Sequence, residues 1–184
     1  MVTEDEARAA VETILRFLGE DPSRDGLRDT PKRVIKAWLE STSGYWETPE
    51  THLCRVFDLP SDEMIVVRGI RFYSTCEHHL LPFHGEAVVA YIPGERVVGL
   101  SKLARVVDMY ARRLQCQERM TDQIAQAIND WLAPRGVGVL VRAHHLCMGC
   151  RGVRQPESEM VTSATIGAMR DNPSARNEWL QLSR

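Results

Sequence analysis

Two short segments rich in cysteine and histidine lie far apart in the sequence, so a fold that uses both must bring them together. The first is CEHH at residues 76–79, and the second is HHLCMGC at residues 144–150. Together they contain four of the six histidines and three of the five cysteines. Thiolates and imidazoles are the usual ligands of tetrahedral zinc. The two segments therefore predict a zinc site.

The spacing within each segment indicates which side chains face the same way. Cys76 and His79 are three residues apart, which places both on one side of a tight turn and leaves His78 differently oriented. If His145 and Cys147 continue the strand before them, their period of two puts them on one face. We therefore expect Cys76, His79 and Cys147 to share one metal ion.

Two arrangements of this zinc site are compatible with the spacing. In a closed structural site, the CxxC spacing supplies Cys150 as a fourth ligand, and spacing alone slightly favours this arrangement. In an open site, the fourth position is left for water, and His78 and His145 transfer protons beside it. The surplus histidines favour the open site, because imidazole titrates near neutrality and a hydrolytic reaction needs a base and an acid. The remaining alternative is ordinary buried cysteines and surface histidines without a metal.

The composition is that of a soluble globular chain of ordinary size. It has 184 residues, of which 43% are hydrophobic and 26% charged, with a formal net charge of −2. This charge argues against bulk attraction to nucleic acid or to an anionic membrane. The acidic start is followed by no apolar stretch, and no window approaches the ~20 apolar residues that cross a bilayer. We therefore expect a cytoplasmic protein.

The chain divides by pattern into a helical arm and a mixed domain. Amphipathic patterns at residues 4–18 and 30–41 predict two helices within an N-terminal helical arm at 1–44. Within residues 45–184, strands are expected at 64–72, 85–92, 138–143 and 160–166, and helices at 101–114, 120–132 and 175–182. The order ββααββ predicts an α+β fold, in which an antiparallel sheet carries a helix pair on one face. The two sheet edges favour subunit association.

Cationic side chains around the helix expected at 101–114 predict a pocket for an anion. Ser101, Lys102 and exposed backbone N–H groups lie where a strand ends and a helix begins, and Arg105 follows one turn later. Three further cations are candidates for the same pocket: Arg33, Lys36 and Arg151. Taken one at a time, these residues are more typical of a helix cap or an exposed surface.

Gln117 and Glu118 lie between the two central helices and are candidates for recognising a nucleobase. A carboxylate accepts two parallel N–H bonds, which is the arrangement that a guanine edge offers. Helix capping near Thr121 is the alternative role of this segment.

Taken together, these motifs closely resemble those of the GTP cyclohydrolase I family, and the similarity spans nearly the whole chain. The central motifs are CEHHLLPF at 76–83, GLSKL at 99–103, RLQ at 113–115, QER at 117–119, HLCM at 145–148 and RGV at 151–153. Further motifs are RDTP at 28–31 with Arg33, VTSA at 161–164 and EWL at 178–180. Motifs this numerous and in this order are highly specific.

The resemblance implies the tunnelling fold, with subunits that share their sheets in pentameric barrels stacked as a decamer. It also implies zinc at Cys76, His79 and Cys147, and GTP as the substrate. The family hydrolyses GTP at purine C8, releases that carbon as formate and rearranges the ribose. The product is dihydroneopterin triphosphate, so the resemblance places the chain at the first step of folate or pterin biosynthesis.

The resemblance also assigns roles to individual residues. Glu118 holds the guanine edge, assisted by Gln117 and by backbone groups around residues 98–100. His145 is expected to protonate N7, which makes C8 electrophilic, and His78 to shuttle protons in later steps. The triphosphate is bound by six side chains: Arg33, Lys36, Ser101, Lys102, Arg105 and Arg151.

Two departures from the family pattern leave alternatives open. Cys150 stands where the family usually has another residue; it is a fourth ligand, a disulfide partner of Cys147 or, as we expect, a residue without a role. Glu159 and Met160 precede Val161 where the family usually has threonine, which suggests an altered purine substrate or only a different packing. The alternative to an enzyme is a non-catalytic, zinc-stabilised oligomer that binds nucleotide. A nitrile reductase of the same fold is disfavoured, because that reaction needs a lone activated thiolate.

Overall fold

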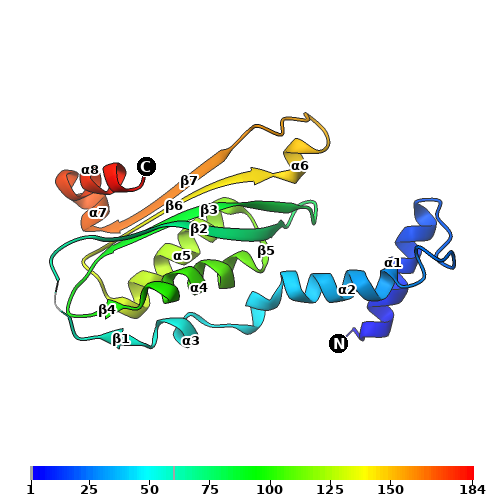
Figure 1. Ribbon diagram of the computed structural model, residues 1–184, viewed down its shortest axis with the longest axis horizontal. Coiled ribbons are helices and arrows are strands. Elements are labelled where there is room, and N and C mark those ends of the chain that lie inside the picture. Colours follow the sequence, from blue (N-terminus) through cyan, green and yellow to red (C-terminus); the bar gives the residue numbers. More distant parts are fainter. Residues whose placement is uncertain (1, 60) are drawn as a thin grey trace. The chain divides into compact units, whose positions relative to one another are not determined.

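The structure is a computed structural model that describes residues 2–59 and 61–184. The chain divides into two compact units, residues 2–42 and Ser43–Arg184, and each is described by itself. Figure 1 shows their helices and strands in sequence colours.

The first unit consists of two helices, α1 (Glu4–Phe17) and α2 (Thr30–Ser41). A capping box starts α1: the backbone N–H of Glu6 donates to the Thr3 hydroxyl, and the Thr3 N–H donates to the Glu6 carboxylate. Val11 of α1 and Ile35 of α2 are buried in this unit. Both helices predicted from the amphipathic pattern are confirmed to within one residue.

The second unit is built on a five-stranded sheet in the order β5-β2-β3-β6-β7. The four long strands are antiparallel: β2 (Ile65–Cys76), β3 (Pro82–Ile92), β6 (Gly136–His145) and β7 (Met160–Gly167). The short strand β5 (Leu114–Gln115) runs parallel to the end of β2. A separate two-stranded sheet joins β1 (Val56–Phe57) to β4 (Val97–Val98).

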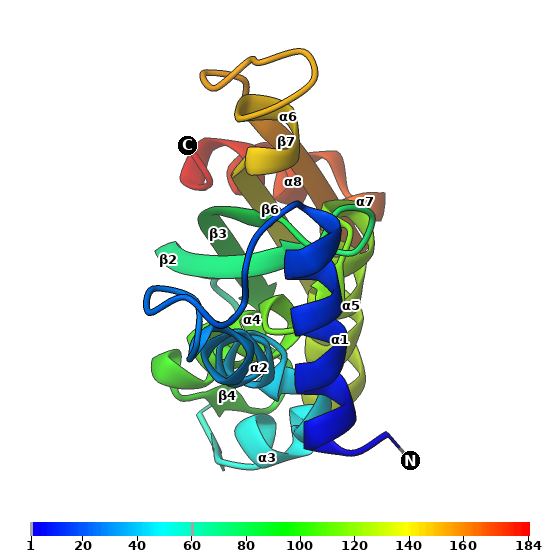
Figure 2. The same ribbon diagram turned by 90° about the vertical axis from the view of Figure 1, so that its right-hand side faces the viewer.

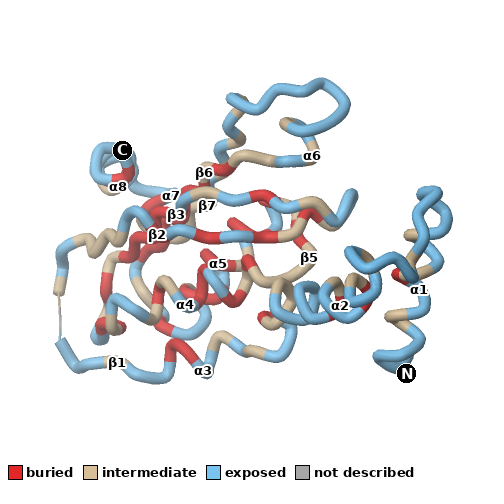
Figure 3. Tube along the Cα trace, turned by 45° about the vertical axis from the view of Figure 1, so that its right-hand side comes forward, coloured by how far each residue is buried: buried red, intermediate tan, exposed pale blue. Residues whose placement is uncertain are grey.

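Helices cover both faces of the main sheet, and strand alternation decides which side chains each face buries. The odd-numbered residues Ala87, Val89 and Tyr91 of β3 join the larger core, with α4 (Leu100–Ala111) and α5 (Gln117–Leu132). Figures 1 and 2 show α4 and α8 on opposite sides of β3. Buried residues are concentrated in the strands and in α4 and α5 (Figure 3).

The opposite face is closed by α7 (Ala168–Asp171) and α8 (Pro173–Leu182). Trp179 of α8 is fully buried in a second core with the even-numbered residues of β3. A Cβ at Gly138 would lie 2.7 Å from the sulfur of Met169 and 2.8 Å from the Trp179 ring. Glycine at this position of β6 therefore makes room for the indole.

The α+β prediction is confirmed, while the simple order ββααββ is incomplete. Strand β5 enters between the central helices, so α4 ends at Ala111 instead of Leu114, and α5 begins at Gln117 instead of Met120. The long strands also extend beyond their predicted ends, to Cys76 and His145. Short elements missing from the prediction are η1 (Ser43–Trp46), α3 (Pro49–Leu53), α6 (Leu146–Gly149) and α7.

The main sheet has two open edges within residues 2–59 and 61–184. Strand β7 pairs only with β6, and β5 covers β2 only at Thr75 and Cys76. The outer edge of β7 and most of the outer edge of β2 therefore carry backbone groups without a strand partner. No helix in this part of the chain is long and apolar enough to cross a membrane.

Candidate metal centre and nucleotide site

The turn between β2 and β3 brings Cys76 and His79 together, as their spacing predicted. Cys76 ends β2, its N–H donates to the carbonyl of Leu81 at 2.9 Å, and its carbonyl accepts the N–H of Leu80 at 2.8 Å. Leu80 adopts a left-handed conformation (φ 54°), which lets the chain reverse within the turn. The Cys76 Sγ lies 3.8 Å from Nδ1 of His79 and 3.8 Å from Nδ1 of His78.

Cys147 reaches the same place by a different route from the predicted one. Strand β6 ends at His145, and Cys147 lies in the short helix α6, so the expected two-residue alternation from His145 does not apply. The register pairs His145 with Phe83 at the start of β3, beside the turn that follows Cys76. The ligand atoms of Cys76, His79 and Cys147 all lie within 4.8 Å of one another.

The geometry of this group fits a tetrahedral metal ion. Zinc–sulfur and zinc–nitrogen bonds place neighbouring ligand atoms roughly 3.3–3.8 Å apart, close to the 3.8 Å between Cys76 and His79. Burial raises the pKa of the Cys147 thiol, and the neighbouring Cys76 raises it further. A cation between the two sulfurs favours their deprotonated forms. The group is therefore compatible with a metal ion.

Cys150 does not join the group. It is exposed and follows α6, while Cys76 is buried and Cys147 half-buried. Among the residues that the structure describes, only Cys76, His79 and Cys147 form a cluster of this kind. The arrangement matches the three-residue alternative, with His78 and His145 beside it.

His145 is held in a fixed position next to the metal-ligand group. Its ring stacks on Phe83, with centroids 4.5 Å apart and planes 3° from parallel, and its Nε2 lies 2.8 Å from Oε1 of Gln117. Burial lowers the pKa of His145, and the charge of Glu118 partly opposes this shift. Glu118 itself is exposed at the start of α5, one residue from Gln117.

Gln117 determines which nitrogen of His145 carries a proton. Its side-chain NH₂ donates to the carbonyls of Val141 and Met160 and to the hydroxyl of Thr162, at 3.0–3.1 Å. These acceptors leave the amide oxygen facing His145, so Nε2 of His145 is the donor in that bond. The Gln117 side chain is buried and bound to protein groups, so its part in base recognition stays a prediction. Sequence reasoning assigned no role to Phe83 or Thr162, although both lie within motifs of the family resemblance, CEHHLLPF and VTSA.

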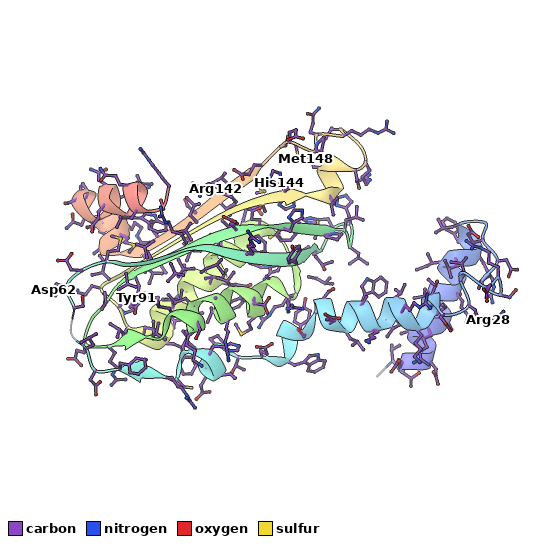
Figure 4. The ribbon with its side chains drawn as sticks, viewed as in Figure 1. Arg28, Asp62, Tyr91, Arg142, His144 and Met148 are labelled. Atoms are coloured by element: carbon purple, nitrogen blue, oxygen red, sulfur yellow. The ribbon has the colours of Figure 1, made fainter. Side chains whose placement is uncertain are left out.

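The predicted anion-binding residues of α4 lie at the other end of the unit. Ser101 and Lys102 are in the first turn of α4, just after Val98, whose N–H donates to the Tyr91 hydroxyl at 3.0 Å. From Phe83 to Tyr91, strand β3 extends roughly 25 Å. Figure 4 shows Tyr91 and Met148 at opposite ends of the sheet.

One chain therefore does not bring Ser101 and Lys102 to the metal-ligand group. Arg105 lies on α4, one turn after Ser101 and Lys102. Arg151 lies two residues after the end of α6, and its charge lowers the pKa of Cys147, opposing the effect of burial. Arg33 and Lys36 lie on α2 in the other unit.

The fold and the site define an α+β protein with a Cys–His–Cys group that is compatible with a metal ion and has two further histidines near it. The sequence profile of one family, described as GTP cyclohydrolase I, matches residues 7–184. The chain belongs to the GTP cyclohydrolase I family.

Several relatives are more than half identical to this chain over the aligned residues. A GTP cyclohydrolase 1 of Alkalilimnicola ehrlichii is 55% identical over 177 residues, which cover 96% of this chain and 96% of that protein. A GTP cyclohydrolase 1 of Synechococcus sp. (strain JA-3-3Ab) is 54% identical over 177 residues, covering 96% of this chain and 77% of that protein. A GTP cyclohydrolase 1 of Streptomyces coelicolor is 52% identical over 182 residues, covering 97% and 90%.

Proposed function

We propose that this protein is a zinc-dependent GTP cyclohydrolase I of the cytoplasm. It converts GTP and water into 7,8-dihydroneopterin triphosphate and formate, the first step of folate and pterin biosynthesis. The observation that carries the proposal is the Cys76–His79–Cys147 group with His145 fixed beside it. Family membership and the names of the relatives support the same reaction.

In this proposal the metal is held by three residues, and the protein side chains perform the remaining tasks. Cys76, His79 and Cys147 hold the zinc, which supplies Lewis acidity and polarises water when bound. The Glu118 carboxylate accepts the two N–H bonds of the guanine edge. Since Glu118 and Gln117 are neighbours on α5, a base held by Glu118 lies near His145.

Proton transfer falls to the two histidines that do not bind the metal. His145 protonates guanine N7, and this makes C8 open to attack by water. Its Nε2–H is engaged with Gln117, so Nδ1 is the nitrogen left to exchange protons with the substrate. His78 is exposed beside Cys76 and moves protons during the later ring opening and ribose rearrangement.

The triphosphate site is completed by other copies of the chain. Ser101 and Lys102 lie at the end of the unit opposite to the metal-ligand group of their own chain, and Arg105 follows them on α4. We infer that they act in a neighbouring subunit's site, together with Arg151. Arg33 and Lys36, in a helical arm at 1–44, add further charge to it.

The proposed assembly is the tunnelling fold, with residues 45–184 as the catalytic domain in a decamer of two pentamers. The open edges of β2 and β7 support this assembly, because pairing one with the other continues a sheet from subunit to subunit. A heterologous contact of this kind closes into a ring when the rotation from one subunit to the next is a whole fraction of a full turn.

Incubation of the zinc-loaded protein with GTP tests the proposal. Formate and a product that becomes fluorescent on oxidation should appear together, and His145→Ala should abolish both. A zinc-loaded oligomer that binds GTP but yields neither product would instead be the non-catalytic nucleotide-binding protein. An altered purine substrate is a further outcome, since Met160, which is part of the departure from the family pattern, accepts a hydrogen bond from Gln117 through its carbonyl.

A further inference from the structure

The side chains of Glu77 and Arg119 join the two parts of the site, although neither residue has a role in the reaction proposed above. Glu77 lies in the turn between Cys76 and His79, and Arg119 is on the first turn of α5, directly after Glu118. Nη1 of Arg119 donates to Oε1 of Glu77 at 3.2 Å, and Nη2 donates to Oε2. The two charged groups therefore form a two-pronged pair.

The remaining donors of Arg119 bind a third segment, the short strand β5. Its Nε donates to Oε1 of Gln115 at 3.2 Å, and Nη2 also donates to the carbonyl of Leu114 at 3.1 Å. The backbone N–H of Glu77 donates to the carbonyl of Gln115 at 3.0 Å. One guanidinium thus connects the metal-ligand turn, β5 and the start of α5.

We propose that Glu77 and Arg119 are positioning residues that set the metal-ligand turn against the helix that recognises the base. Cys76 and His79 flank Glu77, while Gln117 and Glu118 precede Arg119, so any shift of this pair moves both halves of the site. The expected effect of this pair on zinc binding does not depend on the proposed reaction. Only the expected effect on GTP binding rests on the proposed function.

The exposure of the pair separates this role from a contribution to overall stability. The side chains of Arg119 and Glu77 are 43% and 30% exposed, and pairs this accessible contribute little to the free energy of unfolding. The two-pronged geometry, in contrast, fixes the relative direction of two groups, which a lysine cannot do with one ammonium. We therefore expect substitutions to alter the site far more than the stability.

Zinc affinity of the full chain is the decisive measurement, made by competition with a chromogenic chelator. Arg119→Met should raise the zinc dissociation constant about 10-fold, at the lower end of the effects seen for groups that orient metal ligands. Arg119→Lys should rescue little of this loss. Exchanging the charges, with Glu77→Arg and Arg119→Glu together, should recover part of it.

A matched control is Arg71→Met, which removes an exposed Arg–Glu pair with Glu86 across β2 and β3. The inference is overturned if zinc binds Arg119→Met as tightly as it binds Arg71→Met. It is equally overturned if the variants lose zinc affinity only in proportion to a fall in the urea concentration at which half of the protein is unfolded. If Arg119→Met does not fold, Glu77→Gln, which keeps one acceptor, decides by the same comparison.

The Michaelis constant for GTP supplies the second readout, and it should rise several-fold in Arg119→Met at saturating zinc. An unchanged constant would refute the expected effect on GTP binding and leave the effect on zinc binding to the chelator measurement. Failure of the wild-type protein to release formate from GTP would contradict the proposed function alone, because zinc affinity is measured without substrate.

Discussion

Replacing Gln117 with methionine should damage both the fold and the reaction through one side chain. Methionine has a similar length but neither donates nor accepts in this position. The Gln117 side chain is 1% exposed, and its NH₂ group, with two hydrogens, serves Val141, Met160 and Thr162. Its oxygen is the acceptor for His145. The substitution removes all of these bonds.

The expected loss can be worked out from the groups left without partners. Two hydrogens satisfy two acceptors at a time, and each buried group left unpaired costs about 1–3 kcal/mol. The hydroxyl of Thr162 keeps its bond to Thr121, at 2.7 Å, and Val141 and Met160 lie in paired strands. The N–H of His145 is therefore the buried group left unpaired, and the two lost bonds to acceptors add about 0.5–1.5 kcal/mol each. Burial of the thioether offsets part of this, and the net loss in the free energy of unfolding is about 2–4 kcal/mol.

Urea unfolding followed by tryptophan fluorescence, at one fixed protein concentration, measures the stability change. Gln126→Met is the matched control, since Gln126 is an exposed glutamine on the same helix, and its effect should stay within about 0.5 kcal/mol. Where Gln117→Met is still folded, kcat should fall about 100-fold because the imidazole is less well oriented. Equal stability of the two variants, or an unchanged kcat in folded Gln117→Met, would refute the reasoning.

Three further predictions concern the metal, the base and the assembly. Elemental analysis should find zinc retained in Cys150→Ser and lost from Cys147→Ser. Loss of zinc from both variants would support the closed structural site, with Cys150 as the fourth ligand. Glu118→Gln should raise the Michaelis constant for GTP about 10–100-fold. The constant for inosine triphosphate, which lacks the 2-amino group, should rise less; an equal rise for both substrates would exclude Glu118 from base recognition. Lys102→Met and His145→Ala should each be inactive alone, yet mixing them before assembly should restore about a quarter of the sites if each site draws on two chains; absence of recovery would argue for a site within one chain.

The sequence predicted those parts of the site that depend on local spacing. Cys76 and His79 meet because a three-residue separation within a tight turn brings them to one side. The helices of residues 2–42 follow from a periodicity that needs no partner. Cys147 reaches the group as predicted, although a helical turn takes the place of the expected strand continuation.

The parts that depend on register between distant segments were beyond prediction. The stacking of His145 on Phe83 follows from the pairing of β3 with β6, and the bond that His145 donates to Gln117 follows from where α5 packs against β6 and β7. Strand β5 has only two residues, too few for any periodic pattern. The distance from Ser101 to the metal-ligand group depends on the length of β3, which exceeds its predicted length because Pro82 and Phe83 also pair with β2.

The open outer edge of β7 makes an isolated chain prone to aggregation. Its unpaired peptide groups, described above, form a template for any extended segment in solution. When the chain refolds from denaturant, this edge pairs with misfolded copies as readily as with native ones. Amorphous precipitation therefore competes with correct assembly during refolding. The yield of refolded protein should consequently depend on how quickly native copies associate.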